Sequence, residues 1–164
     1  MHVLSKHDVS ERSSIPEPSV VVHGTSSGFA QEVVIGRHRL NADEPSAAGG
    51  TEIGPNPYEL LLAALGACQS MTVAMYARRK NWPLQAIVVR LSHTKSHAED
   101  CIECYTEERM LDRIDCELEL RGSLTPTQRL TLFEIAEKCP VHRTLTSEIS
   151  IQSRLALHSR ADDS

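Results

Sequence analysis

Aromatic residues are scarce in this chain of 164 residues, where two Phe, three Tyr and one Trp make up 4 % of the sequence. Proteins that bind single-stranded nucleic acid stack the bases on several aromatic side chains, so the composition argues against such a platform. The hydrophobic core must instead be built mainly from Leu, Val, Ile, Ala and Met.

Long runs of basic residues are also missing from the sequence. The chain has 17 Lys and Arg against 22 Asp and Glu, which gives a net charge of −5. A surface that follows a phosphate backbone needs concentrated positive charge. We therefore expect no nucleic-acid partner.

No strictly hydrophobic run has the length of a membrane span. The longest nearly unbroken apolar run covers residues 60–68, well short of the roughly 20 residues that cross a bilayer as a helix. The first residues mix Lys6, Asp8 and Glu11 without an apolar core, which is unlike a secretory signal. We expect a cytoplasmic protein with no membrane partner.

The overall composition is that of one soluble globular domain. The chain is 40 % apolar and 24 % charged, with 8 Gly and 8 Pro, and its length suits a single domain of ordinary size. Residues 1–18 are polar and follow no period, so we predict a flexible leader there. A single domain is predicted over residues 19–157, followed by a polar tail at 158–164.

The domain is predicted to open with a meander of three strands. Apolar and β-branched residues bounded by Gly-rich turns indicate strands at 20–22, 29–35 and 37–42. Residues 43–55 are rich in Gly and Pro, so they predict a loop.

The clearest helix signal follows this loop. Asn56 can cap a helix, Pro57 suits its first turn and Glu59 completes a pattern similar to a capping box. The helix is predicted to run from Pro57 to about Lys80. Because residues 60–68 are apolar on every side, its first half must be buried.

The second half of the domain is predicted to hold two strands, two helices and a last strand. Alternating apolar residues indicate strands at 87–91 and 114–120. Thr125 begins a capping pattern for a helix whose inward residues are predicted to be Leu130, Phe133, Ile135 and Ala136. A short helical turn at 141–145 and a strand at 149–155 complete a chain of the α/β (α+β) class.

The segment between the two middle strands is polar, irregular and rich in His and Cys. This composition predicts a loop over residues 93–109 that carries a site. Four residues in it are of the types that zinc or iron selects. These candidate metal ligands are His93, His97, Cys101 and Cys104.

These four residues can share one ion only if the chain turns. On an extended strand His93 and His97 would lie about 13 Å apart, so a turn near Lys95 is required. Asp100 or Glu103 are alternative ligands, and a second chain can supply others. A loop with no metal, or with an oxidised Cys pair, remains the competing interpretation.

Five cysteines, an odd number, argue against a disulfide framework. Cys68 lies in the apolar helix, where a free cysteine is most often a small buried hydrophobe. Cys139 precedes Pro140 and can stand at the N-cap of the next helical turn, where backbone N–H groups lower the pKa of a thiol. His142 and Arg143 follow within one turn and would act in the same direction, unless they are only a surface pair.

Two sequence motifs together are specific. One is Gly-Pro-Asn-Pro-Tyr-Glu-Leu-Leu-Leu-Ala-Ala-Leu-Gly-Ala-Cys, which ends at Cys68, and the other is Cys-Pro-Val-His, which begins 71 positions later at Cys139. With them the chain resembles the OsmC/Ohr family of osmotically inducible and organic hydroperoxide resistance proteins over residues 20–155. The motif Ala-Asp-Glu-Pro at residues 42–45 resembles the pattern of a less studied branch of this family.

The resemblance implies an intertwined homodimer with antiparallel sheets around long central helices and with sites at the subunit interface. It also implies a peroxidase of the oxidative stress response. In this activity Cys68 attacks an organic hydroperoxide, Cys139 resolves the product as a disulfide, and a dithiol is the reductant. No cofactor is required.

Two positions depart from the family pattern. The peroxidases place a Glu directly after Asn-Pro, where this chain has Tyr58 and then Glu59, which is our candidate for that catalytic role. The peroxidases also have an Arg in the turn after the first strand, which holds the Glu and the thiolate. The corresponding turn of this chain contains no Arg. The candidates to replace it are Arg37, Arg39 and Arg143. The alternative function is a binding protein for small molecules, or a thiol redox sensor, without turnover.

Overall fold

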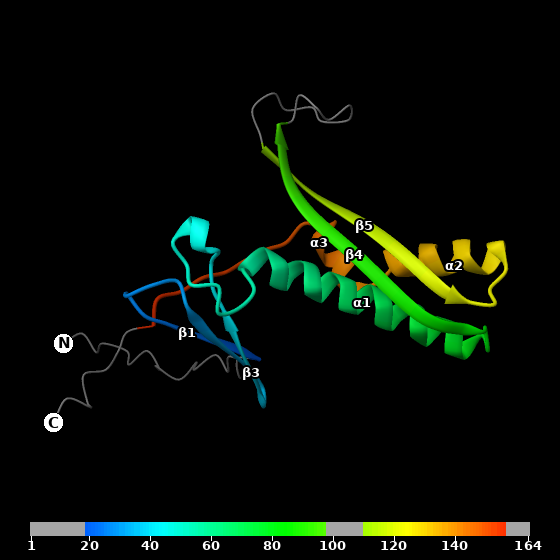
Figure 1. Cartoon of the computed structure of the whole chain (residues 1–164), viewed down its shortest axis with the longest axis horizontal. Coiled ribbons are helices and arrows are strands. Elements are labelled where there is room, and N and C mark those ends of the chain that lie inside the picture. The colour runs from blue at the N-terminus through cyan, green and yellow to red at the C-terminus, as the bar shows by residue number, and fades with distance from the viewer. Residues whose placement is uncertain (1–18, 98–109, 157–164) are drawn as a thin grey trace, which may run out of the picture. The chain divides into compact units, whose positions relative to one another are not determined.

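The computed structural model describes residues 19–97 and 110–156, and the chain forms two compact units that divide after Pro57 (Figure 1). Each unit has its own antiparallel sheet, with three strands in the first unit and two in the second. The expected mixed class with antiparallel sheets is confirmed. The predicted leader and tail, residues 1–18 and 158–164, lie outside the described residues.

The first unit contains the predicted meander. Its strands are β1 (Val20–Gly24), β2 (Gln31–Ile35) and β3 (His38–Ala42), which pair in that order. Val33 of β2 is buried and faces Val22 on one side and Leu40 on the other. Cross-strand pairs of aliphatic residues are the main stabilising contacts of such a small sheet.

A buried carboxylate organises the loop after β3. Asp43 is 2 % exposed, and its Oδ2 accepts hydrogen bonds from Thr51, at 2.8 Å from the backbone nitrogen and 2.6 Å from the hydroxyl. The backbone N–H groups of Glu44 and Ile53 donate to the same side chain. The bond from the Thr51 hydroxyl is the largest cause that lowers the pKa of Asp43 from 3.8 to about 2, while burial opposes it. An ionised carboxylate therefore fixes the predicted loop.

The second unit is built around a long hairpin with helices beside it, as Figure 1 shows. Its elements are α1 (Pro57–Arg79), β4 (Leu84–His97), β5 (Met110–Gly122), α2 (Pro126–Glu137) and α3 (Pro140–Leu145). The helix predicted from Pro57 to about Lys80 is confirmed to within one residue. The capping box of α2 is also confirmed, because the side chains of Thr125 and Gln128 each accept a hydrogen bond from the other's backbone N–H.

The core of the second unit lies between α1, α2 and the hairpin. Its buried residues are Val73, Ala77, Leu124, Leu132 and Ala136. Tyr76 and Trp82 pack edge to face beside it, with ring centroids 5.6 Å apart. Gly66 allows α1 to approach β4 closely, since a Cβ at this position would lie 2.7 Å from the Leu91 side chain.

The predicted inward face of α2 is partly wrong. Leu130 and Phe133 are 66 % and 46 % exposed, whereas Leu132 is fully buried and Ala136 is 3 % exposed. Leu130 precedes Leu132 by two residues, which is about 200° around a helix, so the two cannot share one face. The buried stripe follows the i, i+4 spacing from Leu132 instead.

Two predictions about irregular segments also need correction. The predicted loop over 93–109 is wrong for its first five residues, because β4 extends to His97; the remainder, 98–109, lies outside the described residues. The strand predicted at 149–155 is absent from the described chain: its apolar side chains are between 51 % and 87 % exposed and pair with no strand. Alternation alone cannot form a strand without a sheet edge to bind.

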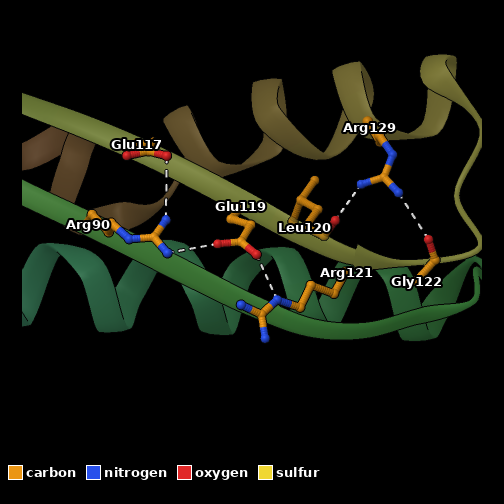
Figure 2. Close-up of polar contacts among 7 residues, drawn as sticks. All are labelled: Arg90, Glu117, Glu119, Leu120, Arg121, Gly122 and Arg129. Atoms are coloured by element: carbon orange, nitrogen blue, oxygen red, sulfur yellow. Dashed lines mark hydrogen bonds and ion pairs between the residues drawn. The ribbon is translucent and has the colours of Figure 1, made fainter.

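The outer face of the hairpin is charged. Figure 2 shows a ladder in which Arg90 bridges Glu117 at 3.4 Å and Glu119 at 2.8 Å, while Glu119 also accepts from Arg121 at 2.7 Å. Arg129 of α2 donates to backbone carbonyls at the end of β5, including that of Gly122 at 3.0 Å. The Arg129 bonds hold α2 against the hairpin. The exposed ion pairs of the ladder indicate that this face is in contact with solvent.

Helix α1 exposes much of its apolar surface within one chain. The predicted burial concerned residues 60–68, of which Leu65 and Gly66 are buried while Leu61 is 36 % exposed, so it is only partly met within one chain. In the second half of the helix, Met71 and Met75 are 70 % and 64 % exposed. By length and composition α1 is able to cross a membrane, with a mean hydropathy of 1.6 over 18 residues, of which 22 % are buried. The core helix of a soluble protein passes the same test, and α1 packs closely on β4 at Gly66.

Candidate functional site

Cys139 occupies the N-cap of α3. Its backbone is extended, with φ −64° and ψ 148°, and Pro140 fills the first helical position. The Cys139 Sγ accepts a hydrogen bond from the backbone N–H of His142 at 3.3 Å. The sequence prediction of an N-cap cysteine is therefore confirmed.

The predicted lowering of the Cys139 pKa is wrong. The side chain is 0 % exposed, and burial is the largest of the causes that raise the pKa of this thiol above 9.0. The backbone N–H groups of Val141 and His142 lower the pKa, but their effect is smaller. Burial wins because a thiolate loses more solvation in the core than two backbone donors return.

Cys68 lies beside Cys139, although 71 positions separate them in the sequence. The Cys68 side chain on α1 is half-buried and within hydrogen-bonding contact of the Cys139 thiol, and this proximity further raises the Cys139 pKa. Both cysteines are free thiols. The site thus pairs one partly accessible sulfur with one that is fully enclosed.

Glu59 does not join this pair within one chain. It precedes Cys68 by nine residues, which in a helix is about 13.5 Å along the axis and half a turn around it. Its carboxylate instead lines a separate cavity of about 480 Å³ between α1 and β4, together with Gly66 and Leu91.

The candidate arginines lie in both units. Arg37 and Arg39 belong to the first unit, where Arg39 is 2.7 Å from Glu32. Arg143 lies on α3, but no basic side chain is among the groups that shift the Cys139 pKa.

Tyr58 forms a cluster of its own with the hairpin. Its ring stacks on His93, with centroids 4.3 Å apart and planes 14° from parallel. The Lys95 ammonium lies 5.6 Å from the Tyr58 ring centre, and His93 Nε2 is 2.8 Å from Asp112 Oδ1. Tyr58, at the start of α1, thus covers a His–Asp pair on the hairpin.

The predicted convergence of four metal ligands is wrong for His93 and His97. Both lie on the continuous strand β4, so the chain makes no turn near Lys95, and the two residues are about 13 Å apart along it. His93 is bonded to Asp112 instead. Cys101 and Cys104 lie outside the described residues, and within the described ranges no three His, Cys, Asp or Glu residues form a metal-binding group.

A cavity of about 410 Å³ adjoins the cysteine pair. It is enclosed by α1, β5, α2 and α3, and its lining includes Cys116 and Gln69. Burial is the main cause that raises the pKa of Cys116, while a hydrogen bond from Gln69 lowers it. The sequence pattern did not reveal this cavity, although the alternation of Ile114, Cys116 and Leu118 placed Cys116 on the inward face of its strand.

Comparisons with known proteins agree with this fold. The family model described as OsmC-like protein matches residues 49–154. A comparison with curated proteins gave no match.

Solved structures of the same type are similar at low identity. The OsmC-like protein of Mycoplasma pneumoniae is 19 % identical, with a TM-score of 0.62 over 77 % of this chain and 84 % of that one. The organic hydroperoxide resistance protein OsmC of Legionella pneumophila is 19 % identical, with a TM-score of 0.57 over 77 % and 87 %. OhrB of Bacillus subtilis, an organic hydroperoxide resistance protein, is 21 % identical, with a TM-score of 0.53 over 77 % and 88 %. The chain therefore belongs to the OsmC-like protein family.

Proposed function

We propose that the protein is a thiol-dependent peroxidase that reduces organic hydroperoxides through Cys68 and Cys139. One observation carries the proposal: a half-buried thiol on α1 touches a fully buried thiol at the N-cap of α3. Two neighbouring thiols of unequal exposure support a division of roles, in which one meets the substrate and the other reacts only with the first.

Cys68 is the attacking residue in this mechanism. Burial raises the pKa of Cys139 and keeps its thiol protonated at neutral pH, so Cys139 is a poor first nucleophile. Cys68 is half-buried and therefore accessible to a small peroxide. The order of reaction follows from the difference in accessibility and from the raised pKa of Cys139.

The reaction needs only the two sulfur atoms, the substrate and a reductant. The Cys68 thiolate attacks the terminal peroxide oxygen, the O–O bond breaks, and the alkoxide takes a proton and leaves as an alcohol. Cys139 then attacks the resulting sulfenic acid, so that an S–S bond forms and water leaves. A dithiol reduces this bond by exchange and becomes a disulfide itself. No metal or cofactor takes part.

A specific observation favours the alternative, a redox sensor or small-molecule binder without turnover. Tyr58 stands where the peroxidases carry Glu, and its ring is engaged with His93. Glu59 lines another cavity. A thiol pair that is oxidised once and reduced slowly would signal peroxide rather than remove it.

The proposed enzyme is a homodimer, and a second copy covers α1. Met71 and Met75 expose most of their surface in one chain, and contiguous apolar surface of this kind marks an interface. We expect two chains in sedimentation at micromolar concentration, and a stable monomer would contradict this part of the proposal. A reducing compartment such as the cytoplasm would supply the dithiol.

A peroxidase assay with matched serine variants tests the proposal. We expect the wild-type protein to consume cumene hydroperoxide continuously with excess dithiothreitol, and Cys68→Ser to lose this activity by at least about 100-fold. Cys116→Ser is the matched control, since it removes a thiol outside the pair and should keep most of the activity. Consumption of a single equivalent by wild-type protein, without turnover, would favour the sensor. Unchanged turnover in Cys68→Ser would contradict both.

A further inference from the structure

The cavity beside Cys116 contains a buried acceptor whose hydrogen-bonding capacity is not used. Gln69 is 5 % exposed, and its Oε1 is the buried side-chain oxygen or nitrogen that lacks a partner among the described residues. The other end of the same amide interacts with the Cys116 thiol. A buried acceptor without a partner destabilises the folded chain unless a ligand or solvent donates to it.

The walls of this cavity have a definite chemical character. Apolar side chains from four elements line it, including Leu65 of α1, Leu118 of β5, Phe133 of α2 and Leu145 of α3. The half-exposed Phe133 ring leaves apolar surface open to a bound molecule.

The charged groups in the lining are of one sign. Asp112 and Glu137 both contribute carboxylates, none of the lining residues is Lys or Arg, and His142 contributes an imidazole. His93 engages one oxygen of Asp112, and Glu137 is exposed on α2. A positive charge is therefore favoured at the cavity and a carboxylate is disfavoured.

We propose that this cavity is a binding site for a small apolar amine, whose N–H group donates to Gln69 Oε1 while its hydrocarbon part contacts Phe133 and Leu118. The acceptor supplies orientation and the apolar walls supply most of the affinity. The negative lining selects a cationic ligand over an anionic one.

This inference does not rest on peroxidase activity. Neither Cys68 nor Cys139 is among the residues that line the cavity, and binding involves no change in any thiol. The Cys68→Ser variant is therefore expected to bind the amine as the wild type does, even if the protein has no peroxidase activity.

Calorimetric titration of the full chain with two probes of equal length tests the site. The probes are 4-phenylbutylamine and 4-phenylbutanoate, which differ only in the charged end. We expect the amine to bind at least about 10-fold more tightly than the carboxylate, because only the amine donates to Gln69 and suits the negative lining. Equal affinities, or no binding of either probe, would overturn the proposal; a second copy that fills the cavity would produce the latter result.

A pair of matched variants assigns the binding to Gln69. Gln69→Met keeps a similar volume without the acceptor, and we expect it to weaken the amine at least about 10-fold. Gln85→Met makes the same change at an exposed position outside the cavity and should leave binding unchanged. Without ligand, Gln69→Met should melt at or above the wild-type temperature, which separates lost binding from lost folding. An amine affinity unchanged in Gln69→Met would contradict the assignment.

Protection of Cys116 gives a second readout that does not depend on heat signals. The Cys116 side chain lies in the lining and is exposed in the described chain, and at alkaline pH, where its raised pKa still permits thiolate formation, iodoacetamide should alkylate it. Saturating 4-phenylbutylamine should slow this alkylation several-fold, as followed by peptide mass spectrometry, while 4-phenylbutanoate should not. Equal rates with and without amine would place the ligand elsewhere and overturn the proposal.

Discussion

The loop at Asp43 and the turn at Cys139 are built in similar ways, but the Asp43 carboxyl is ionised and the Cys139 thiol is protonated at neutral pH. Each buries an acidic side chain that accepts backbone N–H groups. Asp43 also receives the Thr51 hydroxyl, and its pKa falls to about 2. Cys139 has weaker sulfur hydrogen bonds and a neighbouring thiol, and its pKa rises. Hydrogen bonding dominates in the first region and burial in the second.

This difference assigns different roles to the two regions. An ionised, fully bonded carboxylate has no spare capacity for chemistry and acts as a structural anchor for its loop. A protonated, enclosed thiol is inert until a reactive sulfur appears beside it. In the proposed mechanism that sulfur is the oxidised Cys68.

The largest expected effect comes from removing the anchor. Asp43→Ala leaves the N–H groups of Glu44 and Thr51 without their acceptor, so we expect the melting temperature to fall by roughly 5 °C or more. Asp115→Ala is the matched control, because its exposed carboxylate bonds with the exposed Arg113 and should change the melting temperature little. Thermal unfolding followed by circular dichroism measures both. Equal losses would show that Asp43 is not the anchor.

A smaller effect is expected at Cys139 at high pH. Because its pKa is raised above 9.0 in the folded chain, its contribution to stability is complete below pH 9 and declines as the pH rises further. The decline is at most about 1.4 kcal/mol per pH unit. Urea unfolding of the wild type and of Cys139→Ala between pH 7 and 10.5 isolates this group. A difference between the two proteins that does not change with pH would contradict the raised pKa.

At Asp43 the loss of stability is expected at low pH, in contrast to the loss at high pH expected for Cys139. A carboxylate with a lowered pKa contributes its full stability above about pH 4 and loses it as the pH falls toward 2. The wild type should therefore exceed Asp43→Asn in stability at pH 6, and the gap should narrow progressively between pH 4 and 2. Unfolding by urea at each pH gives the gap, and a constant gap would refute the bonded, ionised state.

The smallest effect is expected on the solvated face of the hairpin. Arg90→Gln breaks the bridges to Glu117 and Glu119, but all three side chains are substantially exposed. Exposed ion pairs contribute little, so the melting temperature should change by no more than about 2 °C. A loss as large as that of Asp43→Ala would mean that the charged ladder, and not the buried anchor, controls stability.

Local sequence signals predicted the elements whose formation depends on nearby residues. The caps and prolines at Pro57, Thr125 and Pro140 defined the three helices almost to the residue. Alternation identified the strands but not their length, because β4 and β5 extend each other by pairing. The C-terminal alternation at 149–155 failed because a strand also depends on a partner that alternation does not specify.

The candidate site was only partly predictable for a similar reason. The resemblance singled out Cys68 and Cys139, and the Cys-Pro pattern gave the N-cap. The sign of the Cys139 pKa shift depends on burial by residues from other elements, and no local pattern contains that information. The hydrogen bonds from Thr51 to Asp43, eight residues earlier, were not predicted for the same reason.

The most direct test of the central claim is disulfide mapping after one equivalent of cumene hydroperoxide, without reductant. The account predicts a Cys68–Cys139 disulfide within each chain, loss of two thiols per chain, and a Cys116 that stays reduced. In Cys139→Ser the account predicts a sulfenic acid on Cys68 that dimedone traps. A disulfide that involves Cys116, or oxidation of Cys139 in a Cys68→Ser chain at the wild-type rate, would contradict the proposed pair.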